Sequence, residues 1–363
     1  MSFIKRIVVK LVYGLKNMHY KLLRFCSKWA YRYKVRKHYF PNSNISSVTD
    51  EYMKAVKKYW KQYTKDFDAA YHKFYIGISG KFDVRYIPDD LYVSKIDPYF
   101  NDRDMHIGVC DKNYFNVWFS NVRMPETVCR KINGIWYDAE YKLIDETKVV
   151  QLLKNAGRFV AKPALNSCGG DNVKFFSNPS NNEITNILKD LPSREMIFQK
   201  AIVQHSQLSE IHKESVNSLR IMTLLFKGKV HCIQSILRMG VGTSKVDNAM
   251  SGGVFCGVNP DSGTLKKYAY NQQGKRFDKH PDGFELEGFE IPGYKAAVEM
   301  VMAEAEKLAH FRLISWDVAI DENAQPVLIE ANLQMGDADI VQIPNGPLFG
   351  DLTDEVLAEV FGK

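Results

Sequence analysis

The 363-residue sequence is poor in cysteine, and its cysteines are not spaced as pairs. The six cysteines are scattered along the chain and form no Cys-x-x-Cys motif. This distribution argues against a disulfide framework and favours reduced thiols in a cytosolic protein. The sequence also lacks any apolar run of about 18 residues, which a membrane-spanning helix would need. We therefore expect a cytoplasmic chain without a membrane-spanning segment.

Acidic residues are missing from the first 49 positions, which contain 11 Lys or Arg. The whole chain has 49 basic and 42 acidic residues, a net charge of +7. Removing the first 49 positions from these totals leaves a net charge of −4. The positive charge therefore belongs to an amino-terminal arm and not to the body of the protein.

The arm, residues 1–40, has apolar residues at helical spacing. They are Phe3, Ile4, Ile7, Val8, Leu11, Val12 and Leu15. A signal peptide is disfavoured because Lys10 interrupts the apolar run. Two interpretations have equal weight: a helix at the inner face of the membrane, lying on its anionic surface, and a helix packed on its own protein or a partner. Nucleic-acid binding is not expected, because no recognised nucleic-acid module accompanies the basic residues.

Residues 41–105 are predicted to form a helical and irregular accessory region. The spacing of apolar residues predicts one helical segment around Glu51 to Tyr75. Pro88 and Pro98 predict an irregular segment from Phe82 to Met105. Neither segment contains residues that indicate chemistry.

From residue 106 the pattern alternates between strands and helices. A strand from Arg158 to Pro163 carries Lys162 near its end and leads into a loop that contains Gly169 and Gly170. Backbone N–H groups of such a loop can approach phosphate oxygens, and a lysine can supply positive charge. An ordinary hairpin loop can also contain two glycines, so this signal is weak by itself.

Two further predicted strands, Ser215 to Phe226 and Val230 to Met239, form a hairpin. Arg220 and Arg238 lie among Leu, Ile and Met residues on these strands. An arginine in such a position pairs with a carboxylate or binds a phosphate. Both interpretations remain open from the residues alone.

The stretch Ile314 to Asn332 predicts two strands joined by a polar turn. Apolar residues alternate with polar ones around Asp317, and Leu328, Glu330 and Asn332 are expected to share one face of the return strand. If the strands pair, two carboxylates and an amide oxygen converge, which is a ligand set for Mg²⁺. The alternative is a surface hairpin with solvated acids.

The order of these segments resembles the ATP-grasp superfamily, and in particular its branch associated with sugar transfer and polysaccharide biosynthesis, related to glutamate ligases. The resemblance covers roughly residues 106 to 345. The motifs are DK at Asp111–Lys112, VAKP at Val160–Pro163 with the following SCGGDNV loop, IFQKAI at Ile197–Ile202, SVNSLRIMTL at Ser215–Leu224, VDNAMSGG at Val246–Gly253, and Asp317 with Glu330-Ala331-Asn332.

This resemblance implies a mixed α+β, ATP-grasp fold in which two α/β subdomains, residues 106–197 and 198–363, clamp a nucleotide. It implies phosphate contacts by Lys112 and Lys162, beneath a loop that includes Ser167, Gly169 and Gly170. It also implies adenine contacts by Gln199, Lys200, Ala201 and Ile202. The implied Mg²⁺ ligands are Asp317, Glu330 and Asn332, and the residues at the transferred group are Arg220, Arg238 and Asn217.

The implied activity is that of an ATP- and Mg²⁺-dependent ligase, which joins a carboxylate to an amine through an acyl phosphate. A uronic acid of a surface glycan, or of its precursor, and an amino acid are the expected partners. The alternatives are an ATP-grasp phosphotransferase and a non-catalytic ATP-binding module of polysaccharide assembly.

Overall fold

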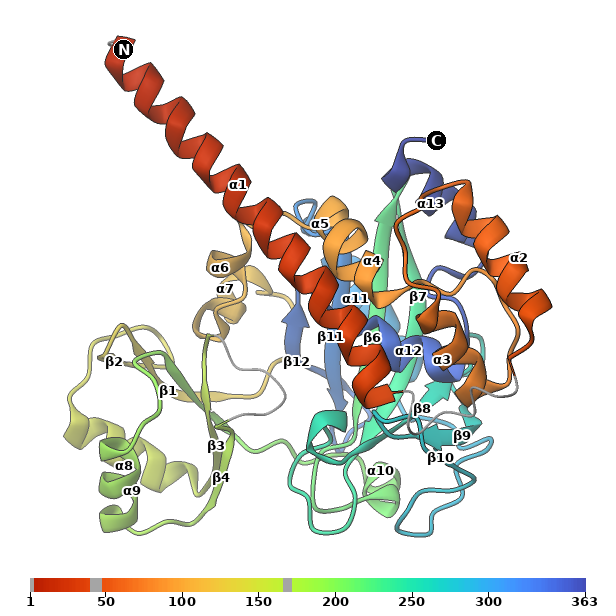
Figure 1. Cartoon of the computed structure of the whole chain (residues 1–363). Coiled ribbons are helices and arrows are strands. Elements are labelled where there is room, and N and C mark those ends of the chain that lie inside the picture. Colours follow the sequence, from red (N-terminus) through yellow and green to blue (C-terminus); the bar gives the residue numbers. More distant parts are fainter. Residues whose placement is uncertain (1–2, 40–47, 166–171) are drawn as a thin grey trace. The chain divides into compact units, whose positions relative to one another are not determined.

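The computed structural model describes residues 3–39, 48–165 and 172–363 (Figure 1). The chain divides into two compact units. Unit 1 comprises Met1–Asn101, Gln273–Lys275 and Asp337–Lys363, and unit 2 comprises Asp102–Gln272 and Arg276–Gly336. Residues 337–363, which the sequence-based division assigned to the carboxyl-terminal subdomain, thus cluster with unit 1. Within the described ranges, every helix is too short or too polar to cross a membrane.

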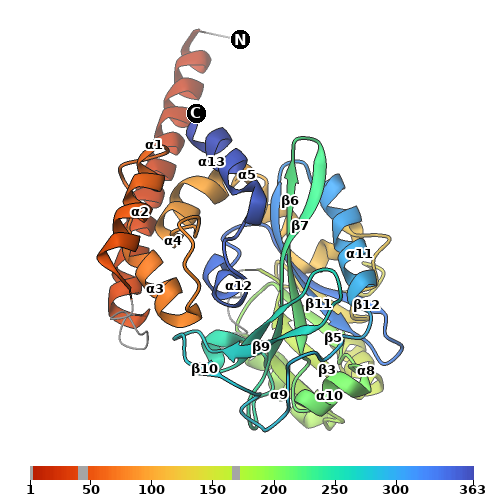
Figure 2. The same cartoon turned by 90° about the vertical axis from the view of Figure 1, so that its right-hand side faces the viewer.

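Unit 1 is helical. Its longest element is α1, which packs against α4 and η4 and extends beyond the other helices of the unit (Figure 2). The elements are α1 (Phe3–Lys34), η1 (Val35–Tyr39), α2 (Asp50–Lys61), α3 (Ala70–Ser79), α4 (Asp89–Leu91), η4 (Tyr92–Ile96), α5 (Asp97–Phe100), α12 (Ala338–Asn345), η7 (Gly350–Leu352) and α13 (Thr353–Phe361).

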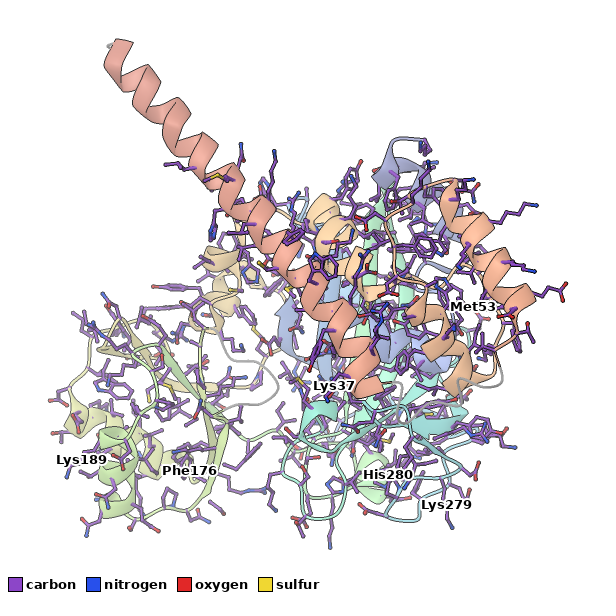
Figure 3. The ribbon with its side chains drawn as sticks, in the orientation of Figure 1. Lys37, Met53, Phe176, Lys189, Lys279 and His280 are labelled. Atoms are coloured by element: carbon purple, nitrogen blue, oxygen red, sulfur yellow. The ribbon has the colours of Figure 1, made fainter. Side chains whose placement is uncertain are left out.

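The accessory region differs from the sequence-based prediction in two places. The single helix expected around Glu51–Tyr75 is two helices, α2 and α3, separated by residues 62–69. α2 packs through Met53, Val56 and Trp60, of which Met53 is labelled in Figure 3. The intervening segment carries Asp66, which pairs with Lys28 and Arg32 of α1, and Asp68, which pairs with Arg36 of η1. The paired residues are about 30 positions apart in the sequence, so the spacing of neighbouring apolar residues does not indicate these pairs.

The segment expected to be irregular contains the helical elements α4, η4 and α5. Pro88 is the residue before the first turn of α4, where the missing N–H group is not needed. Pro98 lies at the start of α5, directly after the wider turn of η4. Both prolines therefore occupy positions that a helical segment tolerates. The expectation of irregular structure was wrong for residues 89–100, whereas residues 82–88 and 101–105 contain no helix.

Unit 2 contains two antiparallel sheets with helices. Its elements are α6 (His106–Val109), η5 (Lys112–Tyr114), α7 (Phe115–Trp118), β1 (Thr127–Ile132), β2 (Ile135–Asp138), α8 (Glu146–Ala156), β3 (Arg158–Pro163), β4 (Lys174–Ser177), α9 (Asn181–Lys189), β5 (Met196–Lys200), α10 (Ser206–Ile211), β6 (Ser218–Phe226), β7 (Lys229–Met239), η6 (Ala249–Ser251), β8 (Val254–Val258), β9 (Leu265–Tyr270), β10 (Arg276–Phe277), α11 (Tyr294–Lys307), β11 (Leu313–Ile320) and β12 (Pro326–Asn332).

The first sheet has the strand order β2-β1-β5-β3-β4 and packs with α8 and α9 (Figure 1). Phe159 of β3 and Phe198 of β5 belong to the core on the helix side. Phe176 of β4, labelled in Figure 3, stacks on Phe159 with ring centroids 5.1 Å apart. Because side chains alternate along a strand, Lys162 and Gln199 are on the opposite face of this sheet.

The second sheet has the strand order β10-β9-β8-β7-β6-β11-β12, and α11 packs on β6, β7, β11 and β12 (Figure 2). Leu219, Leu237 and Trp316 are in the core with α11. The residues that alternate with them are therefore on the other face of the sheet. The hairpin of β6 and β7 turns at Lys227 and Gly228, which both have positive φ, as expected for a two-residue turn.

The predicted hairpin of Ile314–Asn332 is β11 and β12, and Asp317 lies opposite Glu330 in the register. A register shift follows, because Val318 lies opposite Leu328. This bulge puts Leu328 in the core with α11, so Leu328 does not share the face of Glu330 and Asn332 as we expected. All residues of β11 are buried, so the hairpin is not a solvated surface feature.

Candidate functional site

The centre of the site is a cluster of charges on the face of the seven-stranded sheet that α11 does not cover. Asp317 lies opposite Arg220 in the register of β11 and β6. Nε of Arg220 donates to Oδ1 of Asp317 at 2.9 Å, and its Nη2 donates to Oδ2 at 3.0 Å. Nη2 of Arg238, on β7, is 3.1 Å from the same Oδ2. The carboxylate thus pairs with two guanidinium groups from two different strands.

This cluster is buried and ionised. Asp317, Arg220 and Arg238 are each exposed by 6% or less. Burial opposes the charged form of Asp317, but the charges of Arg220 and Arg238 outweigh burial and lower the pKa of the carboxyl group. Of the two interpretations left open for the arginines, the structure thus supplies the carboxylate partner. It leaves the phosphate interpretation as a prediction.

Two lysines lie at the end of this cluster. Nζ of Lys112 is 2.7 Å from Oε1 of Glu330. The backbone N–H of Lys112 donates to the carbonyl of Ala164 at 3.1 Å, which fixes it beside the end of β3 and therefore beside Lys162. Burial, together with the neighbouring Lys112 ammonium, lowers the pKa of Lys162 to about 8. An anionic ligand would stabilise the positively charged form of such a lysine.

The predicted metal ligands offer hard oxygen atoms. Nδ2 of Asn332 donates to the carbonyl of Ser315 at 3.1 Å. This bond holds the amide group to the sheet through its nitrogen and not through Oδ1. Oε1 of Glu330 faces Lys112, and the carboxylate has a second oxygen for a cation. Both carboxylate oxygens of Asp317 contact arginines, so only some of their lone pairs remain for a cation. The donor set fits Mg²⁺, with Glu330 and Asn332 as the more accessible ligands.

The residues expected near adenine lie on β5 and just after it. Nε2 of Gln199 donates to the carbonyl of Pro125 at 3.1 Å, and Nζ of Lys200 is 2.8 Å from Oε1 of Glu126. The backbone N–H of Ala201 donates to the carbonyl of Arg158 at 3.2 Å, and Ile202 follows it in the chain. The segment after β5 thus runs from the first sheet toward the second.

Gln199 and Lys112 line the same cavity of about 280 Å³. Its wall also includes Phe115, Phe119 and Thr127. The lining mixes aromatic side chains with polar and charged ones, among them Glu126 and Arg130. A pocket with apolar walls and polar groups for orientation can hold a nucleotide base. The structure therefore brings one residue predicted at the phosphates and one predicted at the adenine to a common space.

Asn217 is held by a local network. Its Nδ2 lies within hydrogen-bonding distance of Oε1 of Gln204 (3.1 Å) and of the carbonyls of Leu208 and His212 (2.8 Å each). These bonds fasten α10 to the start of β6, so the side-chain nitrogen serves the fold. The substrate role expected for Asn217 remains a prediction. The loop residues Ser167, Gly169 and Gly170 lie outside the described residues.

The sequence analysis missed two residues of this site. The hydroxyl of Ser218 accepts from Nη2 of Arg238 at 2.7 Å and donates to Oδ2 of Asp247. The same Asp247 oxygen is 3.6 Å from Nη2 of Arg238. The alternation of β6 was a usable signal for Ser218, since it shares a face with Arg220. Asp247 lies on a loop, and only the folded chain shows its approach to Arg238.

Comparisons with known proteins agree with this geometry. Residues 97–356 match the model of the family described as sugar-transfer associated ATP-grasp. The match covers more than half of the chain, so the protein belongs to this family, and the class it defines is that of the ATP-grasp enzymes. The expected mixed α+β fold of the ATP-grasp type is confirmed.

Solved structures with partial similarity to this chain were also found. The biotin carboxylase domain of the 2-oxoglutarate carboxylase of Hydrogenobacter thermophilus, in complex with MgADP, is 14% identical over 70% of this chain and 46% of that chain (TM-score 0.43). D-alanyl-alanine synthetase A from Vibrio cholerae is 12% identical over 70% and 66% (TM-score 0.44). The ATP-grasp ligase PsnB with a minimal precursor is 12% identical over 72% and 64% (TM-score 0.41).

The chain thus spans less than two thirds of the length of each of these structures. No curated protein matches the sequence.

Proposed function

We propose that this protein is an ATP- and Mg²⁺-dependent ligase that joins a carboxylate to an amine through an acyl phosphate. The observation that carries the proposal is the convergence of Lys112, Lys162 and Glu330 beside the buried cluster of Asp317 and two arginines. This arrangement offers positive charge for phosphates and oxygen ligands for a divalent cation in one place.

The chemistry requires activation of the carboxylate, because a carboxylate is a poor electrophile. One of its oxygens attacks the γ-phosphorus of ATP, and the bond from that phosphorus to the ADP oxygen breaks. The amine nitrogen then attacks the carbonyl carbon of the acyl phosphate, inorganic phosphate leaves, and the nitrogen loses a proton. A bound Mg²⁺ would neutralise phosphate charge during the first step.

The residues of the chain contribute positioning and charge. Lys112 and Lys162 would hold the phosphates, and Lys162 would regain its full charge beside them. Arg238 would steady the transferred phosphoryl group, since Asp317 and Ser218 hold its guanidinium group in place. Glu330 and Asn332 would be the main ligands of Mg²⁺, with Asp317 holding the arginines in place.

The substrate that we propose is a carboxylated sugar of a surface polysaccharide or of its precursor, with an amino acid as the amine. The support is the sugar-transfer association of the family. The test is an assay of ATP with panels of uronic acids and amino acids, read by mass spectrometry, with ¹⁸O in the acid. Transfer of one ¹⁸O to inorganic phosphate together with an amide product is expected.

A phosphorylated product that forms without an amine would instead indicate a phosphotransferase. Nucleotide binding without turnover across the panel would indicate a binding module. Either result would contradict the ligase proposal.

A further inference from the structure

Helix α1 attaches to unit 1 through its polar face. Nε of Arg32 is 2.7 Å from Oδ2 of Asp90, and Nη2 of Arg32 is 2.8 Å from Oδ1 of Asp66. Nζ of Lys28 pairs with Asp66 as well, and only 15% of the Lys28 side chain is exposed. Lys28 and Arg32 of α1 are therefore directed at the acids of their own unit.

Six large apolar or aromatic residues between positions 15 and 33 of α1 are directed away from the unit. They recur at intervals of three and four, which places them along one side of a helix. Each is exposed by 55% to 63%: Leu15, Met18, Leu22, Phe25, Trp29 and Tyr33. We call these six residues the α1 stripe. At 1.5 Å per residue, the stripe is about 27 Å long.

This orientation is the reverse of that of an ordinary surface helix, which buries its apolar side and exposes its polar side. Of the two interpretations of the arm, packing on its own protein is realised through the face of α1 that carries Lys28, Tyr31 and Arg32. It leaves a continuous row of large apolar side chains in contact with water. A row of this length indicates a surface that another body covers.

We propose that the α1 stripe binds the surface of an anionic membrane, with α1 lying in the plane of the interface. The charge of the arm supports this partner, because residues 1–49 contain 11 basic residues and no acid. Lys21 and Lys37 are exposed on α1 and just beyond it, and Lys37 is labelled in Figure 3. Exposed lysines beside an apolar row can meet anionic headgroups while the row enters the acyl boundary.

The aromatic residues of the stripe support the same partner. Phe25 and Trp29 make an edge-to-face contact with ring centroids 6.1 Å apart, and Arg32 lies 5.7 Å from the centre of the Trp29 ring. Tryptophan and tyrosine are enriched where a membrane meets water, because one end of the ring system is apolar and the other polar. Trp29 and Tyr33 occupy one end of the stripe.

A second copy of the chain is the competing occupant, because intervals of three and four residues also suit a coiled coil. In such a pair the residues beside the stripe would face their equivalents in the other helix. The exposed lysine among these flanking residues is Lys21, and residues 1–49 supply no acid to oppose it. Charge complementarity therefore favours an anionic surface over a second α1.

The test is sedimentation of the full chain with vesicles of phosphatidylcholine alone and of phosphatidylcholine mixed with phosphatidylglycerol. The variant carries Leu22→Gln, Phe25→Gln and Trp29→Gln, which remove apolar area and keep the charge. The matched control carries Ile107→Gln and Leu143→Gln, two residues of unit 2 that are exposed by 69% and 71%. Circular dichroism compares the helix content of the three proteins.

We expect the wild type and the control to bind the anionic vesicles, and the stripe variant to bind at least tenfold more weakly with unchanged helix content. If the stripe variant loses helix content, the single substitution Leu22→Gln takes its place, with a smaller loss expected. The proposal is overturned if the wild type does not bind, if the stripe substitutions leave binding unchanged, or if uncharged vesicles bind equally well. Dimerisation that the stripe substitutions abolish, without vesicle binding, would identify a second copy as the occupant.

Discussion

Two regions of the molecule bury aspartates beside arginines, and they do so with opposite electrostatic results. In unit 2, Asp317 faces Arg220 and Arg238, and its pKa is lowered. In unit 1, Asp90 is fully buried and pairs with Arg32, and burial, together with the nearby Asp68 carboxylate, raises its pKa in spite of that partner. The comparison shows that one guanidinium does not offset the burial of a carboxylate here, whereas two guanidinium groups held by a sheet do.

The geometry of the partners explains the rest of the difference. Arg220 and Arg238 project from neighbouring strands whose register is fixed by the sheet, and both are buried. Arg32 is on a helix, divides its guanidinium between Asp66 and Asp90, and keeps 17% of its side chain exposed. Water therefore screens the Arg32 pairs more strongly than the Asp317 cluster.

The largest effect is expected from Asp317→Asn. The substitution removes the carboxylate that two buried guanidinium groups share and leaves only Asp247, 3.6 Å from Arg238, as a nearby counter-charge, which costs about 3–5 kcal/mol of unfolding free energy. Because the folded-state pKa of Asp317 is lowered, its contribution is present above the unfolded pKa and is lost as the pH falls through the folded pKa. Urea unfolding at neutral and acidic pH measures both, and the deficit of the variant should shrink at acidic pH. A deficit below about 1 kcal/mol at neutral pH would contradict the account.

Nucleotide affinity should depend on the protonation of Lys162. Its pKa of about 8 in the free protein would rise when phosphates bind, so affinity is constant below that pH and falls as the pH increases above it. The decrease approaches about tenfold per pH unit while the bound lysine stays protonated. Titration calorimetry with Mg²⁺-ADP from neutral to alkaline pH measures it. Lys162→Met should bind weakly at every pH without the break, and a break retained in this variant would assign it to another group.

The smallest effect is expected from Asp90→Asn, the counterpart of Asp317→Asn. Since the pKa of Asp90 is raised, its charged form is disfavoured by folding at neutral pH. The protonated form of Asp90 is more compatible with folding than the charged form. Its contribution to the unfolding free energy is therefore present below the unfolded pKa and is lost as the pH rises through the folded pKa. The variant should therefore change the unfolding free energy by at most about 1 kcal/mol at neutral pH. A loss as large as that of Asp317→Asn would remove the distinction between the two regions.

Much of the site could be predicted from local patterns. Alternation along strands identified the hairpin of β11 and β12 and the positions of Arg220 and Arg238, because these features follow from side-chain direction in neighbouring residues. The bulge that moves Leu328 to the core was not predictable, since one extra residue leaves the composition of the strand unchanged. Asp317 and Glu330 still lie opposite each other, because their pair is in the part of the hairpin that the bulge does not shift.

The features that escaped prediction depend on contacts between distant residues. The acids that separate α2 from α3 are held by α1 and η1, and Asp247 approaches Arg238 only when its loop folds. The direction of the α1 stripe also depends on contacts between distant residues. Helical spacing indicates that α1 has two faces, but the acids of unit 1 determine that the polar face is the one that packs.

The central claim is that Glu330, with Lys112 beside it, forms the Mg²⁺–ATP site of a ligase. The most direct test is the rate of ADP release by Glu330→Gln, with Glu322→Gln, an exposed position in the turn of the same hairpin, as the control. We expect turnover to fall by about 100-fold or more in the first variant and to be unchanged in the second, with both proteins folded. Wild-type turnover by Glu330→Gln would contradict the assignment of the site.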